Sequence, residues 1–520
     1  MWKRLFGLDA DVSSDPAARA VRASLPAEMD HEPRRGDTAV FSTWRPLIRG
    51  RLALVVGALA VWAVAIEVRL VFLQVVHAAE YRELALNQQQ RTQRPKGLRG
   101  DIVDRQGRLL AYSVQGQTIE SDPSVIEDAA DTVRRLCAAL GDCTAQERRD
   151  LVARLDSDRS WAPIRKARQV SPDQAARVAA LDLPGIILLP EAQRFYPNVE
   201  LASQVLGFVG SEHEGRSGLE SRYDKVIRGR EGLTLIQKDA RQRRIMTRVE
   251  VEPEAGATVE LTLDLKLQHI AERALQLGIE ENRAEAGTVV IMDPWTGEIA
   301  ALANYPTFNP NIPGKFGADA WKNRAIQDAY EPGSTFKIVT AAAALEEGVL
   351  RPGDMIDCSP GYIKLSGRPA IYDEHTYGLL SFEDVIVKSS NVGSIKAGLR
   401  VGADRFSRWV RRFGFGQGLA PDFAGESAGI VHPPSSLNES GLASMAMGYQ
   451  VSVTPVQMAT AVSAIANGGN LMEPHLVRAI VRDGVREAVA PKILRRAMSA
   501  ETAATITGSC IRRSVRHRCP

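Results

Sequence analysis

The sequence has few of the residues that build metal and redox sites. It contains five cysteines in 520 residues, none of them in a Cys-x-x-Cys spacing, so we expect no metal site. The net charge is only +3, and no long basic block is interleaved with aromatic residues, so nothing indicates nucleic-acid binding. The chain is also too long for one ordinary core, which predicts two or more domains.

Two common enzyme signatures find little support. The segment "EPGSTFK" at Glu331–Lys337 lacks the Gly-Lys-[Ser/Thr] order of a phosphate-binding loop. Asp373, His375 and a serine would suggest a charge-relay triad, but we expect His375 on a surface loop instead.

The cysteines that are present favour an exported protein. Cys137 and Cys143 are close enough in sequence to pair across a helix end in an oxidising compartment. Two unpaired thiols remain the alternative.

One apolar run predicts a membrane anchor. Residues 52–66, "LALVVGALAVWAVAI", are uniformly apolar, and after Glu67 and Arg69 the apolar stretch continues to Val76. This is long enough to span a bilayer, whereas the alternative is a buried core helix. Nine Lys or Arg precede the run, so the N-terminus is expected in the cytoplasm and the rest outside. No small-x-small cleavage site follows, which indicates an uncleaved signal anchor.

The remaining patterns predict alternating helical and strand regions. Gly107 lies in a turn between two short strands, and "GTVVIMDPWTGEIAALANYP" at 287–306 is typical of a hairpin. Mixed charge in "GLESRYDKVIRGREG" at 218–232 favours an exposed face. Mostly helical structure is expected over three further stretches: 77–95 (a polar stalk), 125–182 and 381–470.

Ser334 and Lys337 form the first candidate for chemistry. Pro332 and Gly333 favour a helix start, and "TFKIVTAAAALEEG" predicts a buried helix. Residues at i and i+3 share a face, so Lys337 is expected behind Ser334. Burial disfavours a charged amine, and a neutral amine beside a hydroxyl is a general base. The alternative is a capping serine and a solvated lysine, since Ser-x-x-Lys alone is common.

Ser389 and Asn391 in "VKSSNVGSIKAG" strengthen this hypothesis. A serine and an amide two residues apart, placed on a tight turn between helices, can enter one cleft. The serine can relay a proton, and the amide can hold both Lys337 and a substrate amide. Alone, the pair is equally consistent with a polar helix cap.

With these motifs in order, the sequence resembles the class B penicillin-binding proteins, the single-pass D,D-transpeptidases that cross-link peptidoglycan. It is more similar to their septal, cell-division type than to the elongation type. The resemblance covers roughly residues 45 to 508 and rests on a series of ordered segments: "RGDIVDRQGRLLA", "RFYPN", "GLESRYD", "TLDLKLQ", "MDPWTGEIAALANYPTFNPN", "NRAIQDAYEPGSTFK", "SSNVG" and "MAMGYQVSVTPVQMATAVSAIANGG".

The resemblance implies a role for each site residue. Ser334 would be the acyl-enzyme nucleophile, Lys337 its base, Ser389 a proton relay and Asn391 an anchor for substrate and lysine, with no cofactor. The donor would be the D-Ala-D-Ala end of a stem peptide on lipid-linked or nascent glycan, and penicillins and other β-lactams would acylate the same serine. Partners would be other division membrane proteins, including a septal glycan polymerase, in the cell inner membrane, with the bulk of the chain in the periplasm.

One family motif does not occur. No Lys-Thr/Ser-Gly is found in the sequence, and the last twelve residues, "SCIRRSVRHRCP", do not resemble the family. We therefore expect a transpeptidase domain without its C-terminal strands and weak activity. A serine β-lactamase is the nearest enzymatic rival, although the first 280 residues argue against it. The alternative that stays open is an inactive division scaffold, held by anchor and pedestal.

The expected fold is α+β and multidomain. A transmembrane helix is followed by a mixed α/β pedestal, and then by a transpeptidase domain like that of serine β-lactamases, with a helical subdomain and an antiparallel sheet. The expected divisions are a cytoplasmic tail (1–51), the transmembrane anchor (52–76), a stalk (77–95), the pedestal or dimerisation domain (96–250), a connecting segment (251–284), the incomplete transpeptidase domain (285–508) and an aberrant basic tail (509–520).

Overall fold

A computed structural model describes residues 44–157, 159, 161–165, 170–210, 212–238 and 244–516 of the chain. Most of the predicted cytoplasmic tail and the last four residues of the predicted basic tail lie outside the described residues. The chain divides into two compact units, Met1–Gln89 and Gln90–Pro520.

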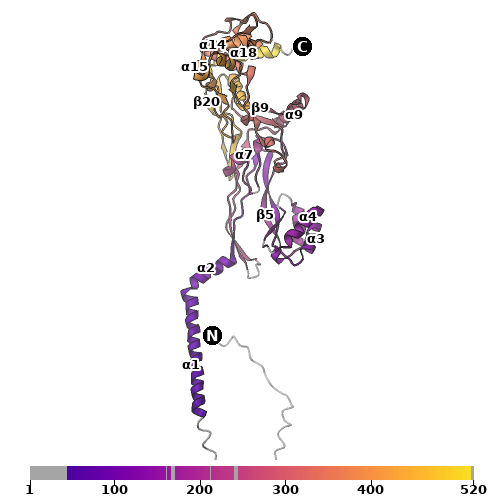
Figure 1. Cartoon of the computed structure of the whole chain (residues 1–520), viewed down its shortest axis with the longest axis vertical. Coiled ribbons are helices and arrows are strands. Elements are labelled where there is room, and N and C mark those ends of the chain that lie inside the picture. Colours follow the sequence, from indigo (N-terminus) through magenta and orange to yellow (C-terminus); the bar gives the residue numbers. More distant parts are fainter. Residues whose placement is uncertain are drawn as a thin grey trace, which may run out of the picture. The chain divides into compact units, whose positions relative to one another are not determined.

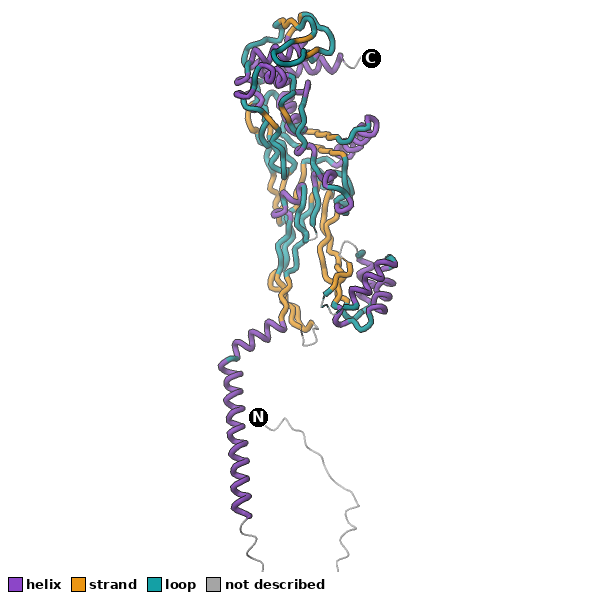
Figure 2. The backbone as a smooth tube through the Cα atoms, in the orientation of Figure 1, coloured by secondary structure: helices purple, strands orange, loops and turns teal. Residues whose placement is uncertain are grey.

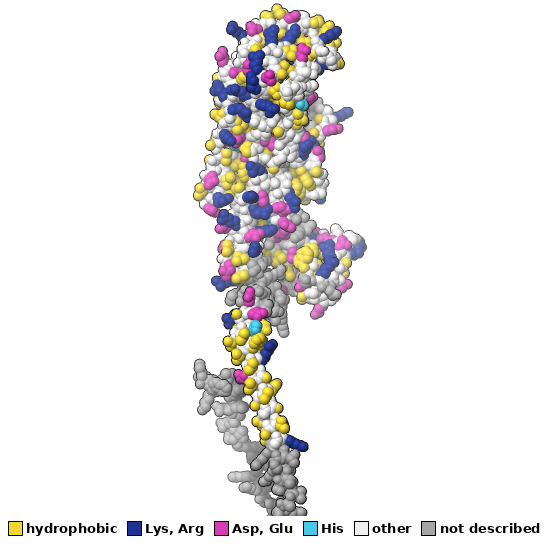
Figure 3. Space-filling view, turned by 60° about the vertical axis from the view of Figure 1, so that its left-hand side comes forward, with side chains coloured by type: hydrophobic (Ala, Val, Ile, Leu, Met, Phe, Trp, Pro, Cys, Tyr) yellow, Lys and Arg dark blue, Asp and Glu magenta, His cyan; other side chains and the backbone are white. Residues whose placement is uncertain are grey.

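The first unit is a set of consecutive helices: α1 (Trp44–Val71), the π-helical turn η2 (Phe72–Val76) and α2 (Ala78–Gln89). Gly50–Val76 is the one helix of the described residues that is long and apolar enough to cross a membrane. Hydrophobic side chains cover it on the face seen in Figure 3, and Leu54 and Trp62 are exposed. A helix that is apolar all round is typical of a membrane span.

The predicted helical stalk ends earlier than expected. Residues 90–93 form strand β1 (Gln90–Gln93), which pairs antiparallel with β6 (Leu233–Lys238), itself paired with β7 (Arg244–Val251). The backbone groups of β6 offer partners to the chain, and this tertiary pairing outweighs the local helical pattern.

A seven-stranded sheet forms the centre of the second unit. Its order is β19-β18-β8-β2-β3-β4, with β5 paired to β3. The predicted strands around Gly107 are β2 and β3. The bounds are β2 (Ile102–Val103), β3 (Leu109–Ser121), β4 (Ala162–Arg165), β5 (Ile186–Phe195), β8 (Thr258–Leu261), β18 (Val477–Arg482) and β19 (Val485–Ala488).

Strands β3 and β5 connect the body of the second unit to a small helical lobe. Figure 1 shows α3 and α4 at the end of this unit opposite α14, α15 and α18. The lobe contains α3 (Ala129–Leu140), α4 (Ala145–Leu155) and α5 (Pro172–Ala180) around its own hydrophobic core. Ser171 caps α5 with a capping box, and Cys137 and Cys143 form a disulfide.

The predicted connecting segment, 251–284, is integrated into the core. Strand β8 lies between β2 and β18, and α9 (Leu265–Asn282) packs on β10. One hydrophobic core contains Ile102 and Leu219 from the predicted pedestal together with Leu302 and Val456 from the predicted transpeptidase domain. The boundary between the two predicted domains is therefore a packed interface.

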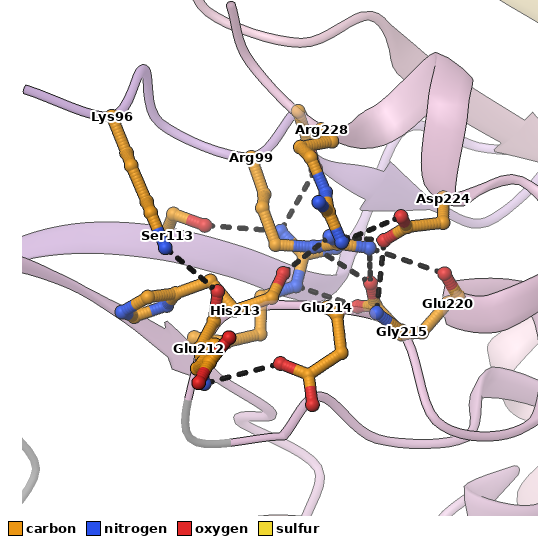
Figure 4. A network of polar contacts seen from close by, with 12 residues as sticks. Lys96, Arg99, Ser113, Glu212, His213, Glu214, Gly215, Glu220, Asp224 and Arg228 are labelled. Carbon is orange, nitrogen blue, oxygen red and sulfur yellow. Dashed lines mark hydrogen bonds and ion pairs between the residues drawn. The ribbon is translucent and has the colours of Figure 1, made fainter. Parts of the chain in front are cut away.

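An ion network ties three segments of the predicted pedestal together (Figure 4). Glu220, predicted on an exposed face, is completely buried, because its carboxylate accepts hydrogen bonds from two arginines. Arg99 donates to it from Nη2 at 2.5 Å, and Arg194 donates from Nε at 2.6 Å. Asp224 accepts from Arg99 Nη1 at 2.7 Å. Two buried guanidinium groups therefore meet the fully buried Glu220 carboxylate, and Arg99 also meets the partly exposed Asp224.

The network changes the pKa values of Asp224 and Tyr196. Burial raises the pKa of Asp224, but hydrogen bonds from Arg99 and from the Gly215 amide outweigh it, so the pKa lies below its ordinary value. Burial, and then the Glu220 charge, raise the pKa of Tyr196 well above its ordinary value. The segment with Glu220 and Asp224 consists of α7 (Gly218–Arg222) and α8 (Asp224–Ile227), which follow α6 (Ser203–Leu206).

The part of the second unit that was predicted to be a transpeptidase domain combines small sheets with many helices. The helices gather near the C-terminal end of the described chain (Figure 2). The predicted hairpin is present as β9 (Gly287–Met292) and β10 (Ile299–Tyr305). Its longer elements are α12 (Lys337–Glu346), α13 (Phe382–Lys388), α14 (Asn391–Val401), α15 (Ala403–Arg412), α16 (Glu439–Ala446), α17 (Pro455–Ala466), β17 (Asn470–Met472), β20 (Ile493–Arg496) and α18 (Ala500–Arg516).

Short elements complete this part: η5 (Pro313–Lys315), α10 (Ala318–Trp321), α11 (Arg324–Gln327), η6 (Gly333–Phe336), β11 (Met355–Asp357), β12 (Tyr362–Ile363), β13 (Ile371–Tyr372), β14 (Leu379–Ser381), β15 (Ile430–Val431), η7 (Pro434–Ser436) and β16 (Val451–Ser452). The largely helical character predicted for 381–470 is confirmed. Helix α18 continues across Ser509, where the sequence predicted the start of a basic tail.

Candidate active site

Ser334 is presented by a turn that two glycines allow. It lies in η6, directly before α12. Gly333 has φ +56°, a conformation that glycine adopts without steric cost, and its amide donates to the Gly448 carbonyl at 3.0 Å. A Cβ on Gly448 would meet the Gly333 oxygen at 2.0 Å. This close contact fixes the turn and leaves Ser334 exposed while Phe336 beside it is buried.

Helix α12 places a lysine in the protein interior. Most of its residues are buried, as the sequence predicted, and Thr340 anchors it by donating to the Ala446 carbonyl at 2.8 Å. Lys337, its first residue, is only 3% exposed. Since burying a charged group is costly without compensation, the surroundings of its amine decide its chemistry.

The Lys337 amine lies within hydrogen-bond distance of three oxygen atoms of Ser389 and Asn391. Nζ lies 2.7 Å from the Ser389 carbonyl oxygen, 3.1 Å from the Ser389 hydroxyl and 2.7 Å from Oδ1 of Asn391. These three partners are neutral. The four residues selected from the sequence therefore meet: Lys337 contacts Ser389 and Asn391, and Ser334 lines the same cavity as Lys337 and Ser389.

The turn between α13 and α14 holds Ser389 and Asn391, as predicted. Ser389 ends α13 in the left-handed region, with φ 58°, which is costly for a residue with a Cβ and is found mostly where function requires it. Asn391 begins α14, and its Nδ2 donates to the Tyr372 carbonyl at 2.8 Å. Because a carbonyl only accepts, this contact turns the Asn391 oxygen toward Lys337.

Asp373 is a positioning residue that the sequence analysis did not identify. Its Oδ1 accepts hydrogen bonds from the backbone amides of Asn391 and Val392, and its Oδ2 accepts from the Ser390 hydroxyl. It therefore caps the first turn of α14. It comes from a loop 18 residues before Asn391, and no local pattern signals this contact.

A cavity of about 550 Å³ lies above these residues. Helix α12 and η6 contribute Ser334, Thr335, Lys337 and Ile338, and the turn after α13 contributes Ser389. The rest of the lining is mainly apolar and comes from α13, α17 and α18: Ile386, Val462, Ile465, Ala466, Thr507, Ser509, Cys510 and Ile511. The cavity is large enough for a small ligand.

The charge-relay alternative finds no support in the structure. His375 is exposed, as predicted, and stacks edge-on against Tyr377, whereas Asp373 binds backbone amides. The sequence does contain one Gly-x-Ser-x-Gly, Gly425–Gly429. It lies in a loop before β15, where Ser427 accepts from the Gly429 amide at 3.2 Å. This is not the strand-to-helix turn that exposes a nucleophile.

The described residues contain no group of three or more His, Cys, Asp or Glu side chains that could hold a metal ion. The groups that the site presents are an exposed hydroxyl, a buried amine, a second hydroxyl and an amide. Such a set can carry out acyl transfer through a covalent intermediate.

Two protein families match the chain. Residues 95–261 match the penicillin-binding protein dimerisation domain, and residues 287–517 match the penicillin-binding protein transpeptidase domain.

Curated relatives agree with this match. The chain is 32% identical over 450 residues to a protein of Pseudomonas aeruginosa named "Probable peptidoglycan D,D-transpeptidase PbpC", covering 86% of this chain and 78% of that protein. It is 32% identical over 437 residues to peptidoglycan D,D-transpeptidase FtsI of Escherichia coli, covering 84% and 73%. The crystal structure of penicillin binding protein 2X from Streptococcus thermophilus has a TM-score of 0.67 at 24% identity, over 81% of this chain and 66% of that one.

Proposed function

The chain belongs to the class B penicillin-binding proteins, which are serine-type peptidoglycan D,D-transpeptidases, and from this premise we propose that Ser334 is its nucleophile and Lys337 the base. The relatives named FtsI fit a role in septal cell-wall synthesis, and they favour an enzyme over an inactive scaffold. The substrate is peptidoglycan, and penicillins bind at the same site.

In the proposed reaction, the neutral Lys337 amine takes the proton from the Ser334 hydroxyl. The serine oxygen attacks the carbonyl carbon between the two D-alanines, and the terminal D-alanine leaves with a proton on its nitrogen. An amino group of a neighbouring stem peptide then attacks the resulting ester, forms the cross-link and returns the proton to the serine. A penicillin enters by the same attack and stays on Ser334.

Ser389 and Asn391 assist this chemistry from the turn after α13. The Ser389 hydroxyl, 3.1 Å from the Lys337 amine, passes the proton toward the leaving nitrogen. Asn391 accepts a hydrogen bond from Lys337 through Oδ1 at 2.7 Å and also holds a substrate amide. Removing a proton relay typically slows such a step by ~10²–10⁴-fold.

One observation carries the proposal. A lysine that is 3% exposed points its amine at three neutral oxygens, next to an exposed serine on the wall of the same cavity. A buried amine and an exposed hydroxyl on the wall of one cavity are the pair that acyl transfer through a covalent intermediate requires.

Covalent labelling with a fluorescent penicillin tests the nucleophile. Ser334→Ala is expected to abolish labelling, and peptide mapping of the labelled protein should place the adduct on Ser334. Thr335→Ala is the matched control, since it removes a neighbouring hydroxyl that lines the same cavity, and it should label normally. Asn391→Ala should slow labelling less than Lys337→Ala. Labelling that persists in Ser334→Ala would refute the assignment, and a chain that never labels would favour the scaffold.

The anchor gives the proposed topology. Residues 52–76 span the inner membrane, 1–51 stay in the cytoplasm, and the stalk and both folded domains lie in the periplasm. The long apolar helix Gly50–Val76 and the nine Lys or Arg before the apolar run support this orientation. A reporter that is active only in the periplasm should be active when fused after residue 95. A reporter fused after residue 40 serves as the control and should be silent, while activity there would reverse the topology.

The pedestal, 96–250, is proposed to position the enzyme among its partners. The family match to a dimerisation domain supports a role in protein contacts. Its partners would be division membrane proteins, including a septal glycan polymerase. Replacing residues 122–185 with a short turn removes the lobe of α3, α4 and α5, which has its own hydrophobic core. This deletion should abolish recruitment to the division site, which fluorescence microscopy of a tagged chain measures. Normal recruitment of the deletion would contradict this role.

A further inference from the structure

Helix α15 and strand β20 carry a cluster of arginines outside the active site. Four come from α15, and two from β20. We call these six the arginine face: Arg405, Arg408, Arg411, Arg412, Arg495 and Arg496. The buried side of α15, with Phe406, Trp409 and Val410, packs on the core, so the charged side is turned outward. Dark blue Lys and Arg side chains gather near the upper end of the molecule in Figure 3.

Contacts to the backbone hold the two elements of the arginine face together. Arg412 donates from Nε to the Arg496 carbonyl at 3.0 Å, and its guanidinium stacks over Trp409 at 5.0 Å. Arg496 donates to the Gly468 carbonyl at 3.4 Å. Gly468 follows Ala466, a lining residue of the cavity, by two positions. Arg496 of the arginine face therefore contacts the loop that directly follows the cavity-lining residue Ala466.

Most of the charge on this face is unpaired. Arg405 pairs with Glu347 at 3.3 Å. In the part of the chain that the structure describes, Arg408, Arg411, Arg495 and Arg496 form no ion pair, and Arg408, Arg411 and Arg496 are exposed. Clustered like charges repel each other at a cost to folding, and arginine is suited to gripping carboxylates through two parallel hydrogen bonds. Such a face fits a ligand with several carboxylates.

We propose that the arginine face binds the carboxylates of stem peptides along a peptidoglycan strand and holds that strand beside the catalytic cavity. The inference rests on the proposed function, which makes peptidoglycan the substrate. Each stem peptide ends in a carboxylate, so one strand presents many carboxylates to a face of six arginines. The contact adds a second point of attachment and raises the local concentration of stem peptides near Ser334.

The test measures binding of end-labelled, soluble, uncross-linked glycan strands that bear pentapeptide stems. Fluorescence anisotropy is recorded at low salt with full-length protein in detergent, in a Ser334→Ala background so that no acylation occurs. The test variant is Arg408→Gln/Arg411→Gln/Arg495→Gln, which removes three charges and no hydrogen bond of those side chains. The matched control, Arg135→Gln/Arg148→Gln/Arg273→Gln, removes three exposed arginines elsewhere.

The test variant is expected to bind strands about tenfold more weakly, given that exposed charge pairs contribute modestly and additively. The control should bind normally, and strands stripped of their stem peptides should bind neither protein well. Equal affinity of both variants, or unchanged binding of stripped strands, would overturn the proposal. Arginine-dependent binding of poly-glutamate or of anionic phospholipid vesicles, without binding of the strands, would overturn it in favour of a protein or lipid partner.

Penicillin labelling of the same arginine variants, with Ser334 intact, separates the two proposals. Normal labelling with weakened strand binding supports both. Absent labelling of the wild-type chain would refute the proposed function, while the binding results would still decide the role of the arginine face.

Discussion

Two regions of the second unit bury basic side chains among different partners. In the pedestal, Arg99 and Arg194 are 3% and 1% exposed and donate to the Glu220 carboxylate. In the catalytic part, the equally buried Lys337 meets two oxygens of Ser389 and one of Asn391. A carboxylate locks a cation in its charged form, whereas neutral oxygens also accommodate the uncharged amine. The first arrangement holds a fold together, and the second allows proton transfer.

Replacing the active-site cation should have the largest effect. Lys337→Ala is expected to slow acylation by penicillin by ~10²–10⁴-fold, since the general base is lost. Lys337→Arg sharpens the comparison, because arginine keeps the charge but cannot give up its proton. Both variants should be similarly slow in stopped-flow acylation. Substantial recovery with arginine would show that Lys337 acts through its charge, as the pedestal arginines do.

Removing the pedestal carboxylate should affect stability and leave the chemistry unchanged. Glu220→Gln leaves two buried guanidinium groups without that charge, which is expected to cost about 3–5 kcal/mol of unfolding free energy. The acylation rate of the folded protein should stay within about twofold of the wild type. Denaturant unfolding followed by tryptophan fluorescence measures the first effect.

Glu254→Gln is the matched control for Glu220→Gln. Its partner is Arg230, and both side chains are largely exposed, at 64% and 76%. The expected change is below about 1 kcal/mol. Similar stability of the Glu220 and Glu254 variants would contradict the structural role of the buried network.

Asp373 combines features of both regions. It is a carboxylate with a structural role, as in the pedestal, but it holds the active-site turn through the backbone amides of Asn391 and Val392. Asp373→Ala should cost about 1 kcal/mol of stability through the lost helix cap. It should also slow acylation by about tenfold, because Asn391 is held less firmly. The rate and the unfolding free energy are measured as above. His375→Ala should change neither, and a large loss in that variant would revive the charge-relay alternative.

Acidification should weaken the pedestal slightly. Burial raises the pKa of Asp224, but hydrogen bonds led by Arg99 leave it below the ordinary value in the folded state. A carboxyl group with a lowered folded pKa stabilises the fold above its unfolded pKa of about 3.9 and loses this contribution as the pH falls through the folded pKa. Asp224→Asn should therefore lose less stability than the wild type between pH 7 and pH 3, by about 1 kcal/mol. If both proteins lost the same stability between pH 7 and pH 3, the ionised Asp224 carboxylate would not stabilise the folded state.

Local patterns predicted much of the architecture. The apolar helix at 52–76 and the hairpin at 287–306 are present in the structure, because each depends on residues close in sequence. The mixed charge of residues 218–232 led to a wrong prediction that Glu220 is exposed. Local composition does not reveal that two arginines, 121 and 26 residues away, donate hydrogen bonds to it. The role of Asp373 was missed for the same reason.

The sequence by itself determined which groups can react. A serine and a lysine one helical turn apart, on an apolar helix, can be read directly from residues 334–347. Only the tertiary structure decided what surrounds them. It placed the Ser389 and Asn391 oxygens within 3.1 Å of the Lys337 amine, and it put Asp373 under the turn that carries them. Periodicity defines the buried face of a helix, but packing between distant segments selects the partners that meet there, and those partners set the charge that a buried group can carry.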